Sequence, residues 1–321
     1  MRLHIGIVLV HIGDFIEALF QCLSLRIGQL RFLFLDEGLA SPRRKAVECL
    51  CNPKAGHEGE CPETARTETP KTIMVVGGGA AGMRAALTAS ERGHVVHLYE
   101  SSRQLGGQLY LAAAPPGRAE FAELARDLAV QVSLSPINVH LNTVVDEALI
   151  QSNPPDHIII ATGARPVTPP IPGIDGANVV QAWDVLRNRV HTGKKVVIIG
   201  GGAVGVEVAL FLAEKGTLSG ETLKFLMVNK AEPMDELYNL AINGTKEVVL
   251  IEMIDRIGEG LGKTTRWTLL QDLKRTNVQA MTATKALGIT PRGVTVEDAQ
   301  GNTLEIPADT VVLGVGSRSH N

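Results

Sequence analysis

The stretch IMVVGGGAAGMRAALTASERG, residues 73–93, decides the fold, because a short apolar run leads through three glycines into a helix-like segment. The same arrangement recurs as VVIIGGGAVGVEVALFLAEKG at residues 196–216. Each apolar run is rich in β-branched residues and predicts a buried parallel strand, after which the glycines turn the chain into a helix. A chain that binds one nucleotide needs one such unit. The repeat therefore predicts two nucleotides, one of which hands electrons to the other.

Each glycine turn fits the spacing G-x-G-x-x-G. The first glycine permits the tight turn, the second lets backbone N–H groups approach a pyrophosphate, and the third lets the helix pack close to the strand. The phosphates then lie at a helix N-terminus, where free N–H groups and the helix dipole favour anions. The expected binding residues are Gly77, Gly79, Ala80, Ala81 and Gly82 in the first turn, and Gly200, Gly202, Ala203, Val204 and Gly205 in the second.

An acidic residue ends the next predicted strand of each unit. Glu100 ends the strand at 94–100, where a carboxylate can accept hydrogen bonds from an adenosine ribose. Glu252 ends the strand at 247–252, after an insertion at 217–244 that we expect to be helical and exposed. A glutamate at that place favours the 2′-hydroxyl of NADH and repels the 2′-phosphate of NADPH, although Arg256 nearby weakens the argument. We expect NADH rather than NADPH at the second turn.

Further predicted elements complete an α/β chain. Residues 157–163 predict another buried strand that ends in a glycine turn, and a proline-rich extended segment follows it. After Glu252 the sequence predicts a helix at 266–276 and short strands at 277–283, 293–298 and 303–316, with the hairpin turn DAQGN at 298–302.

Length, charge and cysteine content limit the class of protein. The 321 residues suffice for roughly two domains, and the net charge of −3 favours neither nucleic acid nor an anionic membrane as partner. The longest near-apolar run of the N-terminus, residues 5–12, is too short to span a bilayer. All four cysteines precede residue 62, which disfavours a secreted disulfide framework. We expect a cytoplasmic protein whose partners are small-molecule nucleotides.

The motifs that begin at Glu100 and follow it in the sequence resemble those of a known family. ESSRQLGGQL at 100–109 resembles the FAD fingerprint of the two-dinucleotide flavoprotein fold, and ATGARPVTPPIPG at 161–173 is similar to the ATG motif of that fold. GGQLYLAAAPPGRAEF at 106–121 and EMIDRIGEGLGKTTRW at 252–267 look more narrowly like the C-terminal module of NADH:flavin oxidoreductases related to 2,4-dienoyl-CoA reductase, enoate-type reductases and trimethylamine dehydrogenase.

The resemblance implies a fold and a function. The fold is α/β, with two Rossmann-like parallel-sheet domains, the NAD domain being inserted into the FAD domain. The function is transfer of hydride from NADH to FAD and of electrons onward to a separate acceptor, with the cofactors carrying the chemistry. No catalytic acid or base is assigned. The resemblance adds Gly106, Gly107, Gln108, Ala161, Thr162 and Gly163 to the FAD site and Glu207 to the NADH site.

The same resemblance gives expected domain boundaries. Residues 1–47 form an N-terminal remnant of unclear fold, and 48–70 form a linker similar to the iron–sulfur junction of the family. The FAD domain occupies 71–188 and returns, truncated, at 289–321, while 189–288 form the NAD(P) domain. Because the return segment is short, we expect one edge of the FAD-domain sheet to be uncovered.

The chain departs from the family in ways that leave alternatives open. The flavin barrel is absent, and Cys49 or Cys51 alone matches a ligand of the [4Fe–4S] cluster, which needs four thiolates, so we expect no metal here. The acceptor is then a separate flavin-barrel or iron–sulfur subunit. A disulfide reductase is excluded, because no cysteine pair follows Cys61. The alternatives are a non-catalytic module that binds FAD or ADP, and an inactive fragment of a longer reductase.

Overall fold

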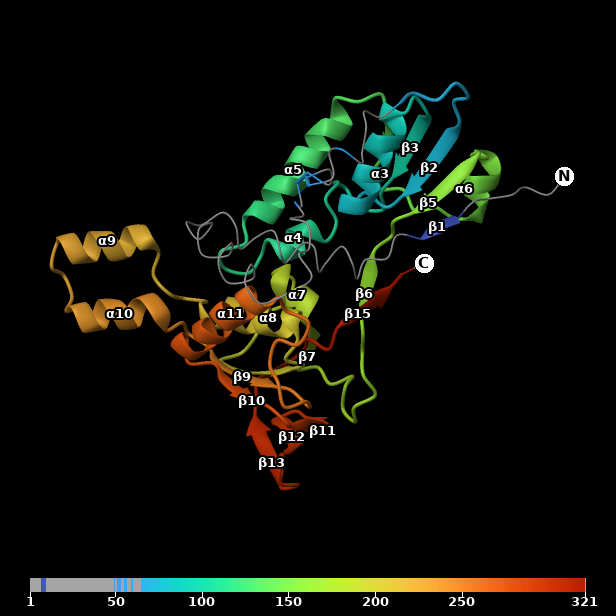
Figure 1. Ribbon diagram of the computed structural model, residues 1–321. Coiled ribbons are helices and arrows are strands. Elements are labelled where there is room, and N and C mark those ends of the chain that lie inside the picture. Colours follow the sequence, from blue (N-terminus) through green and yellow to red (C-terminus); the bar gives the residue numbers. More distant parts are fainter. Residues whose placement is uncertain are drawn as a thin grey trace. The chain divides into compact units, whose positions relative to one another are not determined.

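The chain folds into two compact units, for which the computed structural model describes residues 7–9, 49, 51–52, 55–56, 59 and 65–320 (Figure 1). The first unit contains the described residues as far as Ala113, then Arg118–Arg165, then Ser319 and His320. The second unit contains Ala114–Gly117 and Pro166–Arg318. In the sequence, the segments of the first unit therefore both precede and follow the main segment of the second unit.

A parallel sheet forms the centre of the first unit, with strand order β1-β5-β2-β3-β4. The strands are β1 Ile7–Leu9, β2 Thr72–Val76, β3 Val95–Tyr99, β4 Asn138–His140 and β5 His157–Ile160. The helices are α3 Ala80–Glu91, α4 Leu109–Ala112, α5 Glu120–Ser133 and α6 Glu147–Ser152. Alternate residues of β2 enter different clusters: Ile73 and Val75 pack with residues of α3 and α5, whereas Met74 packs with residues of α6.

A short N-terminal strand that the sequence does not predict lies at one edge of the first sheet, beside β5. β1 pairs in parallel with β5, with Ile7 opposite Ile158 and Leu9 opposite Ile160. The remaining residues of the expected remnant, 1–6 and 10–47, lie outside the described residues. No sequence pattern predicts this pairing, because three residues are too few for a periodic pattern.

A second parallel sheet forms the centre of the second unit, with strand order β10-β9-β8-β14-β7. The strands are β7 Val179–Gln181, β8 Lys195–Ile199, β9 Glu247–Ile251, β10 Gln279–Met281 and β14 Thr310–Leu313. The helices that accompany them are α7 Ala182–Leu186, α8 Ala203–Ala213 and α11 Lys263–Arg275. Helix α8 is apolar on nearly every side, and Val206, Val208 and Leu212 are fully buried, as expected of a core helix.

The remaining described strands form two smaller sheets. β11 Lys285–Thr290, β12 Gly293–Glu297 and β13 Thr303–Pro307 form an antiparallel sheet, and β6 Ala164–Pro166 pairs with β15 Ser317–Ser319. The predicted hairpin turn at 298–302 is confirmed between β12 and β13. The Asp298 carboxylate accepts hydrogen bonds from the backbone N–H groups of Gln300 at 2.9 Å and Asn302 at 2.8 Å. Hydrogen bonds from Asn302 hold the pKa of Asp298 below its ordinary value.

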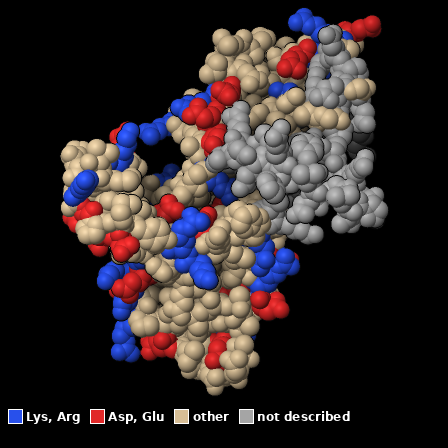
Figure 2. All heavy atoms as spheres, turned by 60° about the vertical axis from the view of Figure 1, so that its left-hand side comes forward, with Lys and Arg blue, Asp and Glu red and all other residues tan. Residues whose placement is uncertain are grey.

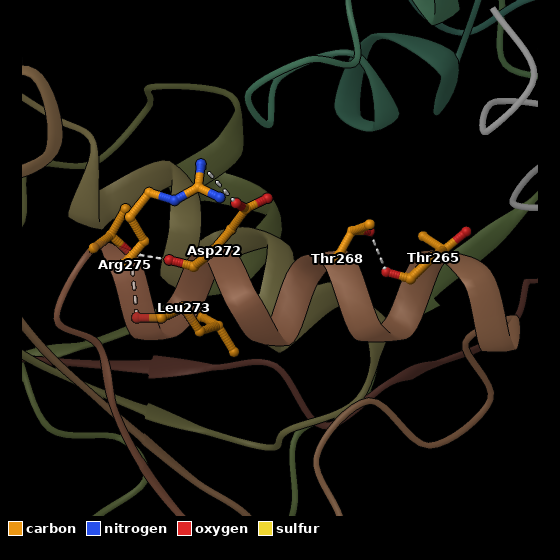
Figure 3. Close-up of polar contacts among 6 residues, drawn as sticks. Thr265, Thr268, Asp272, Leu273 and Arg275 are labelled. Carbon is orange, nitrogen blue, oxygen red and sulfur yellow. Dashed lines mark hydrogen bonds and ion pairs between the residues drawn. The ribbon is translucent and has the colours of Figure 1, made fainter. Parts of the chain in front are cut away.

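Helix α11 Lys263–Arg275 has polar contacts among its own residues (Figure 3). The Thr268 hydroxyl donates to the carbonyl of Thr265 at 2.8 Å, and Arg275 Nη1 lies 3.3 Å from Asp272 Oδ1. Such a charged pair one turn apart supports a helix by a few tenths of a kcal/mol. The predicted helix at 266–276 is thus confirmed and begins earlier, at Lys263.

Glu214, which follows α8, makes stability depend on pH. Burial raises the pKa of Glu214, and Asp272 adds to this effect while Arg275 opposes it. A carboxyl whose pKa is raised by folding contributes stability below its unfolded value of 4.5, and this contribution is lost as pH rises through the folded pKa. We expect Glu214→Gln to raise the Tm at pH 7 and to leave it nearly unchanged at pH 4, measured by calorimetry. Equal shifts at both pH values would contradict this assignment.

Most strands and helices named from the sequence lie within a few residues of their expected positions. The unit boundaries differ from the expected domain ranges, because β7 and β14 both belong to the second sheet and β14 pairs with β8. Residues 289–318 therefore lie in the second unit, and the described part of the first unit receives only Ser319 and His320 from the expected return segment.

Candidate dinucleotide-binding sites

The first glycine turn joins β2 to α3, and its glycines have two different roles. Gly77 has φ of +108°, and a Cβ there would lie 2.3 Å from the carbonyl oxygen of Ala161. A Cβ on Gly82 would lie 1.8 Å from the carbonyl oxygen of Gly77, so the helix packs against the turn. Gly79 has φ of −74°, and nothing lies within 4 Å of a Cβ there. Gly77 and Gly82 are needed by the fold, whereas Gly79 faces open space that a pyrophosphate can enter.

Glu100 holds this turn through its carboxylate. Glu100 Oε2 accepts a hydrogen bond from the Gly78 N–H at 2.7 Å, and Oε1 accepts one from the Ser102 N–H at 2.7 Å. A carboxylate has about four lone-pair positions, so acceptor capacity remains for ribose hydroxyls. The acid therefore lies at the glycine turn, as the spacing predicts.

The Gly-Gly-Gln segment lies directly against the first turn. The Gly106 N–H donates to the carbonyl of Gly78 at 2.8 Å, and a Cβ on Gly107 would lie 3.0 Å from the Gly79 Cα. Because side chains on either glycine would meet this backbone or Tyr110, the two backbones approach closely only without them. The structure thus places Gly106 and Gly107 directly against Gly79, while the direction of a Cβ on Gly79 stays open.

The Ala-Thr-Gly segment after β5 closes the other side of the turn. The Ala161 N–H donates to the carbonyl of Val76 at 2.8 Å. A Cβ on Gly163 would lie 2.8 Å from Gln108 Nε2, which places the Gln108 side chain over Gly163. The Thr162 hydroxyl and the Gly163 carbonyl both bond to the backbone of His320. Apart from Ala80 and Ala81, which begin α3, all expected FAD-site residues therefore form one cluster of bonded or touching segments.

The second glycine turn, between β8 and α8, repeats the first almost atom for atom. A Cβ on Gly205 would lie 1.8 Å from the Gly200 carbonyl oxygen, and nothing lies within 4 Å of a Cβ on Gly202. Glu252 Oε2 accepts a hydrogen bond from the Gly201 N–H at 2.6 Å. Ala203 and Val204 begin α8 and are partly exposed at the turn. The second turn therefore offers the same anion-binding geometry.

Two residues of the second turn were missed by sequence reasoning. Gly314 follows β14, donates its N–H to the carbonyl of Ile199 at 2.8 Å, and occupies the place that Ala161 has in the first unit. Gly258 donates its N–H to the carbonyl of Gly201 at 2.7 Å and brings its loop over the turn. The strand-then-glycine pattern VVLGVG at 311–316 is the signal that could have identified Gly314.

Other expected residues lie beside the second turn. Glu207 is 6% exposed and lies within the buried face of α8, one turn after the glycines. Arg256 Nε lies 3.4 Å from Glu259 Oε2, so this guanidinium has a carboxylate partner of its own.

In the part of the chain that the structure describes, no group of three or more His, Cys, Asp or Glu side chains could hold a metal ion. Cys22 and Cys61 lie outside the described residues. No helix among the described residues has both the length and the apolar character that a bilayer crossing requires.

Comparison with known families decides the assignment. Residues 71–321 match the family model described as pyridine nucleotide-disulphide oxidoreductase. The chain belongs to this family. The match confirms the resemblance drawn from the two glycine turns and the α/β fold of paired Rossmann-like domains. Membership of the pyridine nucleotide-disulphide oxidoreductases implies FAD and NAD(P)H as cofactors. Gly79 and Gly202, the open second glycine of each turn, leave room for the pyrophosphate of one such cofactor each.

Several named proteins are similar to most of this chain. A metal reductase of Desulforamulus reducens is 46% identical over 314 residues, which are 95% of this chain and 45% of that protein. An NADH oxidase of Thermoanaerobacter brockii is 36% identical over 84% of this chain and 38% of its own length. A solved 2-naphthoyl-CoA reductase complex is 28% identical with a TM-score of 0.71, over 84% of this chain and 37% of that chain. The chain spans less than half the length of these relatives.

Proposed function

We propose that this chain is an FAD-dependent NAD(P)H oxidoreductase module that transfers hydride from NADH to FAD and passes electrons to a separate acceptor. The observation that carries the proposal is the duplicated turn. In each copy the second glycine is open, and a glutamate oxygen accepts the neighbouring N–H at 2.7 Å or 2.6 Å. The relatives named as a metal reductase and an NADH oxidase support redox chemistry.

We assign FAD to the first turn and the nicotinamide nucleotide to the second. The first turn alone has the Gly-Gly-Gln segment against its open glycine, which extends the binding surface along a longer cofactor. Bound FAD supplies a carrier that accepts a hydride and releases electrons. The chain's own residues bind and orient: the Gly79 and Gly202 turns admit phosphates, Glu100 accepts ribose hydroxyls, and Gln108 lies over Gly163.

We propose NADH as the preferred donor because of the charges at Glu252. Its Oε1 accepts the Ile254 N–H at 3.1 Å while Oε2 accepts the Gly201 N–H, so the carboxylate is fixed at the ribose end of the site. A 2′-phosphate there would meet this negative charge. Arg256, the nearby cation that could offset it, is paired with Glu259.

Glu252→Ala is therefore expected to change nucleotide choice. Loss of the carboxylate removes two acceptors for NADH and the repulsion of NADPH, so we expect the NADH/NADPH ratio of kcat/KM to fall at least about tenfold. Rates of flavin reduction with each nucleotide measure this. Glu259→Ala, which leaves Glu252 in place and releases Arg256, is the matched control and should lower the ratio less. An unchanged ratio in Glu252→Ala would contradict the assignment.

The visible absorbance spectrum before and after anaerobic NADH addition tests the function itself. The proposal predicts a flavin band, present on purification or after incubation with FAD, that bleaches with NADH. A protein that binds NADH or ADP but never a flavin would instead be the non-catalytic nucleotide module. A flavin band that NADH does not bleach would reject electron entry through the second turn. Adding candidate iron–sulfur or flavin-barrel proteins to the bleached sample then tests the separate acceptor.

A further inference from the structure

The insertion between α8 and β9 forms a helical hairpin that stands out from the second unit (Figure 1). It consists of α9 Gly220–Val228 and α10 Met234–Ile242. The two helices contact each other, and among their apolar side chains Leu223, Leu226, Leu237 and Leu240 are buried or half-buried. Neither helix contributes a residue to the glycine turns.

The outer surface of this hairpin also carries large apolar side chains. The side chains of five large apolar residues are half or more exposed: Phe225 64%, Met227 50%, Val228 71%, Met234 64% and Tyr238 59%. Single exposed apolar residues are ordinary on a protein surface, but a concentration of this kind within two short helices marks an interaction site. Figure 2 brings this side of the molecule forward, and charged side chains leave wide areas of other residues between them.

The charges of the hairpin are divided between its halves. The first half, with its turn, carries Glu221, Lys224 and Lys230, and the second carries Glu232, Asp235 and Glu236, all of them exposed. Among the described residues, the ion pairs found involve none of these six. The first half is therefore positive by one charge and the second negative by three. These charges are available to a partner whose pattern is the reverse.

We propose that the α9–α10 hairpin is the surface through which two copies of this chain associate. A two-fold axis makes the contact self-complementary, so α9 of one copy lies against α10 of the other. Each positive half then faces a negative half, and the exposed apolar residues of both copies pack together as a four-helix arrangement. The net charge of the hairpin is negative, which disfavours an anionic lipid surface as the occupant.

The exposed apolar residues agree with a small contact between two copies. Phe225 and Val228 lie one turn apart on α9, and Met234 and Tyr238 lie one turn apart on α10, so each helix offers a pair on one face. Met227 lies on another side of α9. An interface built on these pairs belongs to the small end of the range for specific complexes, about 1,200 Å², and we therefore expect a weak, reversible dimer.

Sedimentation velocity of the FAD-reconstituted protein from about 1 to 100 μM tests the surface. We expect a concentration-dependent dimer, and F225S/V228S should raise its dissociation constant at least about 30-fold, as truncation of central contacts does. Leu304→Ser, which removes an exposed apolar side chain on β13, is the control and should leave the dimer unchanged. A wild-type monomer at the highest concentration, whether or not it binds lipid vesicles, would overturn the proposal, and so would a dimer that F225S/V228S leaves intact.

A charge-exchange experiment separates contacts between copies from contacts within one hairpin. In K224E/K230E both halves are negative, and in D235K/E236K both are positive, so each variant alone should be monomeric. An equimolar mixture restores opposite charges across both contacts and should form a heterodimer that weakens as salt rises. A mixture that stays monomeric, while wild type dimerises, would reject this pairing of halves. If NADH still bleaches the flavin in every variant, a loss of the dimer is not caused by failure of the proposed function.

Discussion

Gly202→Val is expected to abolish reduction of the flavin by NADH while the protein keeps its fold and its FAD. A side chain at residue 202 meets nothing within 4 Å, and the backbone there, at φ −71° and ψ −169°, is extended and open to any residue. The added carbons occupy the space that the nucleotide pyrophosphate must enter. We expect the dissociation constant for NADH to rise at least about 100-fold, a loss of about 2.7 kcal/mol of binding free energy.

Calorimetric titration with NADH measures this loss directly. Gly220→Ala is the matched control, because Gly220 also has nothing within 4 Å of an added Cβ and lies on α9, away from the turn. The control should bind NADH as wild type does. If Gly202→Val bound NADH normally, the second turn would not be the nicotinamide nucleotide site.

Gly82→Ala is expected to have the largest effect on stability. The added Cβ would lie 1.8 Å from the carbonyl oxygen of Gly77, which belongs to backbone and cannot rotate away. α3 must then move off β2, which opens the packed face formed by Met83, Ala86 and Leu87. We expect a loss of at least about 3 kcal/mol of unfolding free energy, comparable with a large core truncation.

Gly79→Ala separates this effect from the loss of a ligand contact. It adds the same methyl group to the same turn, where nothing lies within 4 Å, so the apoprotein should keep its Tm. Gly79→Ala should nevertheless weaken FAD binding, whereas Gly82→Ala should lower the apoprotein Tm and lose FAD together. Thermal unfolding followed by circular dichroism, with FAD fluorescence for binding, distinguishes the two. Equal Tm values for both variants would contradict the packing role of Gly82.

The sequence could predict the two turns because their geometry is local. A glycine with φ near +108° and another packed on it five residues later must appear at fixed spacing, whatever surrounds them. The pattern VVLGVG marks Gly314 as a glycine after a strand, but its place at the second turn depends on β14 lying beside β8, more than a hundred residues away in sequence. The pairing of β1 with β5 is equally non-local.

The Thr162 hydroxyl donates to the carbonyl of His320, and the His320 N–H donates to the carbonyl of Gly163. These two hydrogen bonds link the order of folding to the order of translation. The second unit, Pro166–Arg318, is almost continuous in the chain and can fold as it leaves the ribosome. The part of the first unit that precedes Pro166 is translated before the second unit, whereas Ser319 and His320 are translated after it. The backbone contacts that His320 makes beside the first glycine turn therefore form only after the second unit has been translated.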